Sequence, residues 1–133
     1  MSPQPHVLVI DDDADMRMLM GALLEHLGAR VDSAGSANEI DPILAQSADL
    51  ILLDLVMPPG VYDACVQRLL DSGAQARVCL LSGSSAQALA QERARIDALG
   101  LPTTSPITKP ARLDALASLL ASLHPAAEPS RES

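Results

Sequence analysis

The sequence predicts an α/β protein built around a five-stranded, open parallel sheet with helices on both faces. Short apolar runs alternate five times with longer stretches in which apolar residues recur at helical spacing. The strongest runs are apolar without interruption, as expected of strands that are covered on both faces. Parallel neighbours need crossover connections, and the intervening helical stretches provide them.

Five short segments are the predicted strands: residues 7–10, 30–34, 50–53, 77–81 and a short segment near residue 107. The segment 50–53 is the most hydrophobic and is expected at the centre of the sheet, whereas 30–34 is only weakly apolar. Ligands of such sheets bind at the carboxyl ends of the strands. The residues that follow each strand are therefore the first candidates for a functional site.

Five stretches are predicted helices: residues 16–27, a short helix that carries Ile40, Ile43 and Leu44, and residues 62–70, 85–99 and 113–123. Asp13 or Asp15 is expected to cap the first helix, and Ser36 the short one. Gly28 follows the first helical stripe as a stop signal. The helix 85–99 has the thinnest apolar stripe and is expected to be the most exposed.

A polar residue stands at the end of four predicted strands. Asp11 and Asp12 follow the first strand, Asp54 the third, Ser82 the fourth, and Lys109 the fifth. Because the carboxyl ends of parallel strands meet at one edge of the sheet, these side chains are expected to lie together. Each residue taken singly has an ordinary explanation, such as a helix cap or a surface Lys-Pro pair. Those explanations give no reason for all five to share one edge.

Three carboxylates at one edge require compensation. Brought together, they repel one another by about 4 kcal/mol per pair at ~4 Å with an effective dielectric constant of ~20. A fold tolerates this when a cation is bound there or when one acid keeps its proton. Oxygen donors suit Mg²⁺, whereas zinc fits poorly because no histidine stands beside these acids in the sequence. The sequence thus predicts a magnesium site.

The same side chains fit phosphoryl transfer. A carboxylate can attack phosphorus and form an aspartyl phosphate. Mg²⁺ and the ammonium of Lys109 would offset charge on the phosphoryl oxygens, and the hydroxyl of Ser82 would donate a hydrogen bond. Little further catalytic machinery is needed, because positioning and electrostatics supply most of the effect in such reactions.

Four motifs, VIDDDADMR, LLDLVMP, LLSGSS and ITKP, occur in this order on the predicted strands. Together they resemble the receiver (CheY-like) domain of two-component response regulators over residues 5–124. The resemblance implies a doubly wound, flavodoxin-like sheet with strand order 2-1-3-4-5. Residues 125–133 contain Pro, Ser and Glu without apolar periodicity, so we expect a disordered tail or a linker remnant there.

The resemblance also implies roles for individual residues. Asp54 would be the phosphoacceptor, with Ser82 and Lys109 at the family's hydroxyl and lysine positions. The implied ligands of Mg²⁺ are Asp12 directly, Asp11 through water, Asp54, and the backbone carbonyl of Val56. The donor would be a phosphohistidine of a histidine kinase or histidine phosphotransfer protein, and signalling would use contacts with an unnamed downstream protein. No enzymatic activity is expected beyond the chain's own phosphorylation and autodephosphorylation.

The segment before Lys109 departs from the family pattern. Receivers usually carry an aromatic residue three positions before the lysine, which changes orientation with the Ser or Thr on phosphorylation. Pro106 stands at that position, and the segment 100–105 is longer than usual. A conformational output is therefore expected from another element, such as the loop 102–106 or the helix before it.

Composition argues against several classes of protein. The net charge is −8 without a Lys/Arg cluster, which argues against nucleic-acid binding. No apolar run approaches the roughly 18 residues of a membrane span, and no signal peptide is recognisable, so a cytoplasmic protein is expected. Cys65 and Cys79 lack metal-ligand spacing and are expected as buried, reduced thiols. A monomer or weak dimer is expected.

The other conspicuous side chains have ordinary interpretations. The histidines, His6 among them, show no partner in the sequence and are expected at the surface or at helix ends. Tyr62 is expected to pack locally. Four charged residues of the helix 85–99 are most simply a solvated face: Glu92, Arg93, Arg95 and Asp97.

Three alternatives remain open. A pseudo-receiver would act as a scaffold without cycling phosphate; the intact site residues count against it, and Pro106 counts for it. A second alternative is a regulatory receiver module cut from a multidomain signalling enzyme, since the segment 100–105 resembles receivers attached to cyclic-di-GMP phosphodiesterase domains. The third is a hydrolase or flavin protein. A dehalogenase-like hydrolase needs a second Asp where Val56 stands, and no Gly-rich flavin loop follows the first strand.

Overall fold

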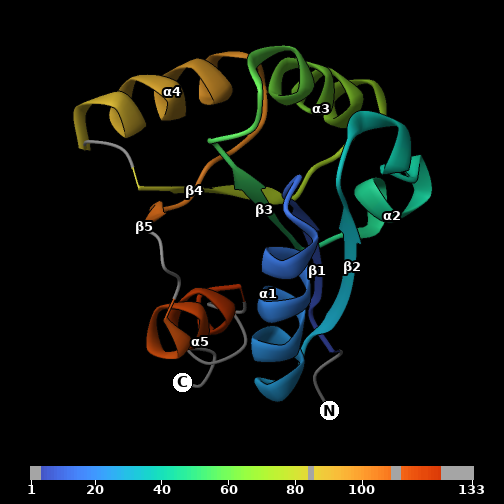
Figure 1. Ribbon diagram of the computed structural model, residues 1–133, viewed down its shortest axis with the longest axis vertical. Coiled ribbons are helices and arrows are strands. Elements are labelled where there is room, and N and C mark those ends of the chain that lie inside the picture. Colours follow the sequence, from blue (N-terminus) through green and yellow to red (C-terminus); the bar gives the residue numbers. More distant parts are fainter. Residues whose placement is uncertain (1–3, 84–85, 109–111, 124–133) are drawn as a thin grey trace, which may run out of the picture.

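Five parallel strands form one sheet in the order β2-β1-β3-β4-β5 (Figure 1), which confirms the predicted fold class and strand order. The computed structural model describes residues 4–83, 86–108 and 112–123. The predicted tail, residues 125–133, lies outside these ranges. The strands are β1 (His6–Ile10), β2 (Arg30–Ala34), β3 (Leu50–Asp54), β4 (Arg77–Ser82) and β5 (Ile107–Thr108).

Helices cover both faces of the sheet. They are α1 (Ala14–His26), α2 (Pro42–Ser47), α3 (Pro59–Asp71), α4 (Ala86–Ala98) and α5 (Leu113–Ala121), with a 3₁₀ turn, η1 (Ala37–Glu39), before α2. Figure 1 shows α2, α3 and α4 on one face, and α1 and α5 on the other. None of the helices in the described ranges is long and apolar enough to cross a membrane.

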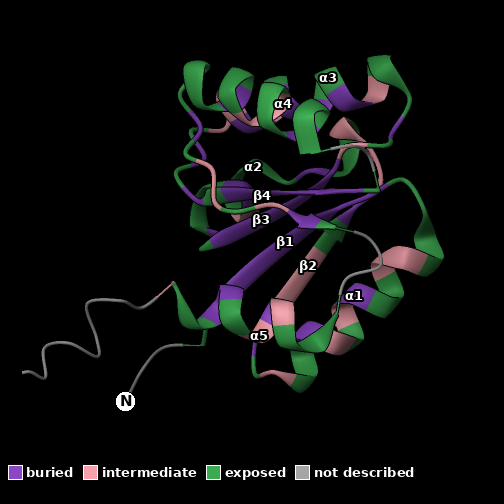
Figure 2. Ribbon diagram, turned by 90° about the vertical axis from the view of Figure 1, so that its left-hand side faces the viewer, coloured by how far each residue is buried: buried purple, intermediate pink, exposed green. Residues whose placement is uncertain are grey.

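The core consists of two apolar layers, one on each face of the sheet. Leu8 and Ile10 of β1 belong to the layer beneath α2, α3 and α4, whereas Val7 and Val9 belong to the layer beneath α1 and α5. The side chains of β3 and β4 alternate between the two layers in the same way. Figure 2 shows the central strands buried along their length, as expected for a sheet covered on both faces.

β3 lies at the centre of the sheet and ends at its carboxyl edge. All five of its residues are buried, and it pairs with β1 on one side and β4 on the other. The register pairs Ile10 with Leu53, so Asp54 and the carboxylates that follow β1 lie level at this edge. The apolar run that predicted a central strand therefore also places the candidate site.

The prediction of one short helix capped by Ser36 is wrong. The backbone forms the turn η1, becomes extended at Ile40, and enters α2 only at Pro42. Ser36 makes no capping hydrogen bond, whereas the carboxylate of Asp41 accepts the amide of Ile43 at 2.9 Å. Proline explains the break, because its ring disfavours a helical residue before it but fits the first turn of a helix.

β5 is short, and the chain before it pairs with β4 separately. A bridge joins Thr103 to Val78, and pairing resumes where Ile107 meets Leu81. The chain takes four steps from Thr103 to Ile107 but only three from Val78 to Leu81, so one residue is extra. Pro106 lies in this interval. Because proline has no N–H to donate, it is tolerated where the ladder of an edge strand is interrupted.

The two cysteines are buried, one in helix α3 and one in strand β4. Cys65 and Cys79 are free and buried, as predicted. Burial raises the pKa of the Cys65 thiol to about 11 and that of the Cys79 thiol to about 12, so both stay protonated near neutral pH.

The prediction that His6 lies at the surface or at a helix end is wrong. It is buried at the start of β1, and its Nε2 lies 2.7 Å from the Asp32 carboxylate on the neighbouring strand.

The charged residues of α4 are more than a solvated face. Tyr62 of α3 donates its hydroxyl to Glu92 at 2.7 Å, and Arg95 donates to the same carboxylate, with a shortest contact of 2.6 Å. The Arg95 guanidinium also lies 5.9 Å from the centre of the Tyr62 ring. A second polar group ties α4 to the segment before β5: Arg93, Asp97 and Thr103. Two expectations are thus corrected. Tyr62 contacts another helix instead of packing locally, and the charged residues of α4 bind α3 and the segment before β5.

The contact between Tyr62 and Glu92 can be tested in solution, because the chain has one tyrosine and no tryptophan. Burial first, and then the hydrogen bond to Glu92, raise the pKa of Tyr62 above its ordinary value of about 10. We expect Glu92→Gln to lower this pKa in an alkaline absorbance titration, while Glu25→Gln on α1 leaves it unchanged. Circular dichroism at each pH verifies the fold. Equal pKa values in the wild type and Glu92→Gln would contradict the contact.

Candidate functional site

The turn after β1 is held by its own aspartates. Asp11 is fully buried, and its Oδ1 accepts the amide of Asp13 at 2.9 Å. The carboxylate of Asp13 in turn accepts the amides of Asp15 and Met16, which confirms that an aspartate of this run caps α1. Asp12 lies between the two and is exposed. The turn thus buries one carboxylate, uses one as a cap and leaves one facing solvent.

Asp54 ends β3 and is only 3 % exposed. Its Oδ1 accepts the amide of Val56 at 3.0 Å, so the turn after the strand folds back onto the carboxylate. The amide of Leu55 donates to the carbonyl of Leu81 in β4 at 2.9 Å, which extends the pairing of β3 beyond its last residue. These contacts fix the orientation of the Asp54 side chain at the edge of the sheet.

The three predicted carboxylates come together. One oxygen from each of Asp11, Asp12 and Asp54 lies within 4.8 Å of the other two. Oxygen donors without histidine or cysteine suit a hard divalent cation such as Mg²⁺ rather than zinc. Two of the residues are buried and one is exposed, which suits an ion that keeps part of its water. The donor set therefore fits the predicted magnesium site.

Two further predicted site residues, Ser82 and Val56, lie close to Asp54 in the sheet or in the sequence. Ser82 is buried at the end of β4, directly after Leu81, which pairs with Asp54. Val56 lies two residues beyond β3 with its amide bound to Asp54 and its side chain 61 % exposed. Lys109 follows β5 and lies outside the described residues. The structure thus gathers four of the predicted residues and Val56 around the carboxyl ends of β1, β3 and β4.

Arg17, the last residue of the motif VIDDDADMR, contacts this site, although no role was predicted for it. Its Nη1 donates to the backbone carbonyl of Asp11 at 2.6 Å. A signal for it exists in the sequence, because the first turn of a helix favours acidic side chains and disfavours a cation. A cation near the N-terminus of a helix is unfavourable for that helix, so Arg17 is a candidate for a contact outside α1.

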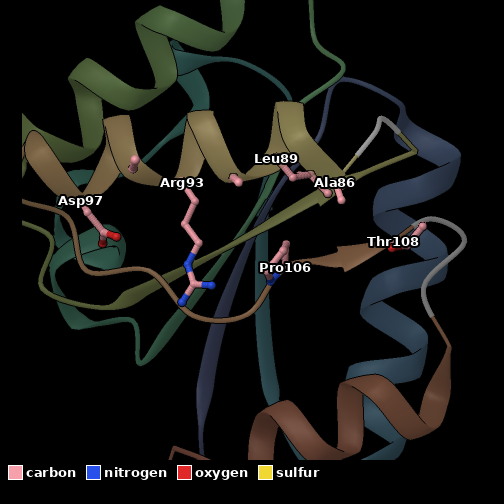
Figure 3. A pocket seen from close by; sticks show the side chains of 8 residues that line it. Ala86, Leu89, Arg93, Asp97, Pro106 and Thr108 are labelled. Carbon is pink, nitrogen blue, oxygen red and sulfur yellow. The ribbon is translucent and has the colours of Figure 1, made fainter.

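A hollow of about 440 Å³ lies between α4 and β5, and none of Asp11, Asp12 and Asp54 lines it. Figure 3 shows Pro106 facing α4 across this pocket, near Leu89 and Arg93. Pro106 stands where receivers usually carry an aromatic residue, and a proline ring leaves space that a larger ring would fill. The proline that replaces the usual aromatic residue therefore lines a hollow between α4 and β5.

An open parallel sheet of order 2-1-3-4-5 defines the flavodoxin-like class of α/β proteins. The carboxylate cluster at its carboxyl edge distinguishes this chain from members that bind a flavin at that place. A family model described as the response regulator receiver domain matches residues 7–121. The chain therefore belongs to the response regulator receiver domain family, whose members signal between histidine kinases and downstream effectors.

Individual proteins are similar to this chain in fold or in sequence. The chemotaxis protein CheY4 of Vibrio cholerae has a TM-score of 0.72 at 22% identity, over 91% of this chain and 99% of that one. A CheY-like receiver domain from Methylobacillus flagellatus has a TM-score of 0.74 at 20% identity, over 92% and 100%. The transcriptional regulatory protein DltR of Streptococcus agalactiae is 28% identical over 111 residues, 83% of this chain and 47% of that protein. The chain thus spans about half the length of the curated relatives it matches.

Proposed function

We propose that this receiver domain accepts a phosphoryl group on Asp54 from a phosphohistidine donor, with Mg²⁺ held by the neighbouring carboxylates. The observation that carries the proposal is the convergence of Asp11, Asp12 and Asp54 within 4.8 Å at the carboxyl edge. Three carboxylates so close are unfavourable unless a cation is bound or one acid keeps its proton. Such a site is suited to a reaction that brings a cation and a phosphoryl group to one carboxylate.

In the proposed reaction, an oxygen of Asp54 attacks phosphorus, a P–O bond forms, and the P–N bond to the donor imidazole breaks. The electron pair of the broken bond stays on the imidazole nitrogen. The Asp54 side chain needs little reorganisation, because the amide of Val56 already holds its Oδ1. We assign Ser82 as a hydrogen-bond donor and Lys109 as a cation toward the phosphoryl oxygens.

Mg²⁺, when bound, supplies positive charge that offsets the carboxylates and the phosphoryl oxygens. We assign its ligands as Asp12 directly, Asp11 through water, Asp54, and the backbone carbonyl of Val56. Burial supports this division of roles. Asp11 is fully buried and already accepts the amide of Asp13, whereas Asp12 faces the solvent from which a hydrated ion arrives.

The proposed donor is a histidine kinase or a histidine phosphotransfer protein, and the proposed output is contact with a downstream protein. If the domain is instead a module of a longer signalling protein, the target is an attached domain and the chemistry at Asp54 is the same. Pro106 cannot change orientation on phosphorylation as the usual aromatic residue does. We therefore assign the conformational output to α4 or to the loop 102–106. Both border the hollow beside Pro106.

Intact-mass spectrometry after incubation with acetyl phosphate tests the proposal. We expect a mass increase of one phosphoryl group in the presence of Mg²⁺ and none when the metal is chelated, because the cation offsets the charge that develops at the carboxylate cluster. Alkaline treatment should remove the adduct, since an acyl phosphate hydrolyses readily. If acetyl phosphate gives no adduct, the same assay uses a phosphorylated histidine phosphotransfer protein as donor.

A folded protein that forms no adduct with either donor would contradict the proposal. Circular dichroism establishes whether the fold is intact. In that case the pseudo-receiver scaffold becomes the better description, in which the carboxylate cluster serves protein contact without cycling phosphate.

A further inference from the structure

We propose that Arg17 is a positioning residue of this site, which sets the direction of the Asp12 carboxylate through the backbone of the turn after β1. Gly35 keeps open the space that the Arg17 side chain needs. The inference rests on the proposed function, because it concerns the same ligands of Mg²⁺.

The contact of Arg17 is with the backbone and not with a carboxylate. Its Nη1 donates to the carbonyl oxygen of Asp11 at 2.6 Å. That oxygen belongs to the planar peptide unit that joins Asp11 to Asp12, so holding it fixes the orientation of this unit. Within the part of the chain that the structure describes, Arg17 forms no ion pair, although three carboxylates cluster beside its contact.

Asp12 is the member of the cluster that depends most on its backbone. Its carboxylate is exposed and makes no hydrogen bond with the described residues, whereas the carboxylates of Asp11 and Asp54 each accept a backbone amide. Hydrogen bonds hold both peptide units that flank Asp12. In the unit between Asp11 and Asp12, the carbonyl oxygen accepts from Arg17. In the unit between Asp12 and Asp13, the N–H donates to the Asp11 carboxylate. Releasing the first unit would free the direction of the Asp12 side chain.

Gly35, the residue after β2, gives independent support. A Cβ atom added at Gly35 would lie 2.6 Å from Nη1 of Arg17, 3.2 Å from its Cζ and 3.2 Å from Oε1 of Glu39. The φ angle of Gly35 is outside the left-handed region, so its backbone does not require glycine. The amide of Gly35 is anchored, since it donates to the carboxylate of Glu39 at 2.6 Å. An alanine at this position therefore displaces the guanidinium, which is the nearer group and the end of a flexible side chain, and presses only slightly on the Glu39 carboxylate.

Two substitutions separate the position of Arg17 from its charge. Gly35→Ala displaces the guanidinium but keeps its charge, and Arg17→Lys keeps the charge on a shorter side chain without the planar group. If Arg17 positions Asp12, both substitutions are expected to weaken Mg²⁺ binding by about tenfold, the loss typical of residues that orient metal ligands. At saturating Mg²⁺, both variants should reach the wild-type level of phosphoryl adduct, because the defect is in metal affinity.

The measurement is a Mg²⁺ titration followed through the NMR shifts of the backbone amides of Asp13 and Val56, which also report whether the site is folded. Gly21→Ala is the control for Gly35→Ala, since an added Cβ there would meet only Val31, at 3.8 Å. We expect Gly21→Ala to bind Mg²⁺ as the wild type does. A purely structural role of Arg17 would lower thermal stability without changing the dissociation constant.

The outcomes are distinguishable. Wild-type affinity in Gly35→Ala and Arg17→Lys, together with tighter binding in Arg17→Met, would show that Arg17 acts only as a charge that opposes Mg²⁺, and would overturn the inference alone. If the wild type itself binds no Mg²⁺, the proposed function fails and the inference fails with it. Weaker binding in both variants, with the adduct restored at high Mg²⁺, supports the positioning role.

Discussion

Asp54→Asn is expected to abolish the phosphoryl adduct completely. An amide cannot form the acyl phosphate, while its size and its oxygen keep the contact that Asp54 makes with the amide of Val56. The fold should therefore persist while the acceptor is lost. In the intact-mass assay with acetyl phosphate and Mg²⁺, the adduct should fall from the wild-type level to background.

Asp13→Asn is the matched control for this experiment. It removes one negative charge from the same acidic turn, and asparagine retains the capping contacts to Asp15 and Met16. We expect this variant to form the adduct as the wild type does. An adduct that survives in Asp54→Asn would mean that another residue is the acceptor, and the assignment of Asp54 would be wrong.

Leu24→Ala is expected to lower the free energy of unfolding by about 2–5 kcal/mol. Leu24 is 0 % exposed and belongs to the apolar layer between α1, α5 and the sheet, where a lost side chain leaves a cavity. A domain of this size has a total stability of about 5–15 kcal/mol, so the loss is a large fraction of it. Urea unfolding followed by circular dichroism measures the change, because the chain has no tryptophan.

Leu19→Ala, in the same helix, is the control for Leu24→Ala. Leu19 is 51 % exposed, so its truncation removes little buried surface, and we expect a change within about 0.5 kcal/mol. The two variants share the substitution and the helix and differ in burial. Equal losses in both would contradict the packing of α1 on the sheet.

The departures from the family pattern lie on one side of the molecule. Pro106, the interrupted pairing of β5 and the hollow beside α4 are neighbours there, whereas the carboxylate cluster lies at the ends of β1 and β3. Helix α4 is also tied to α3 through Tyr62 and Glu92. The carboxylate cluster is thus apart from the region that differs from the usual receiver, whereas Ser82 adjoins that region, because it pairs with Thr108, which lines the hollow.

The fold and the main features of the site could be predicted because they depend on short-range patterns. Uninterrupted apolar runs indicate strands covered on both faces, and the helical stripes between them require parallel pairing. Parallel pairing places the carboxyl ends of the strands at one edge, and the polar residues there follow each run directly in the sequence. The cluster of Asp11, Asp12 and Asp54 therefore required no knowledge of side-chain packing.

Other features depend on side chains that are far apart in the sequence and meet only after the elements pack. His6 is buried because Asp32 lies on the neighbouring strand, and Tyr62 binds Glu92 because α3 and α4 lie on the same face. The spacing of apolar residues along the chain predicts helices and strands, but it does not predict which side chains of different elements will meet.

By itself, the sequence determined the strand-helix alternation, the apolar faces and the residues at the strand ends, since each of these is a property of neighbouring residues. Only the tertiary structure decided how the site is supported. The Arg17 side chain reaches the Asp11 carbonyl beside Gly35 because α1 and β2 are packed against β1. The physical reason is that contacts between elements depend on their relative placement, which burial of the two apolar layers sets for the whole chain at once.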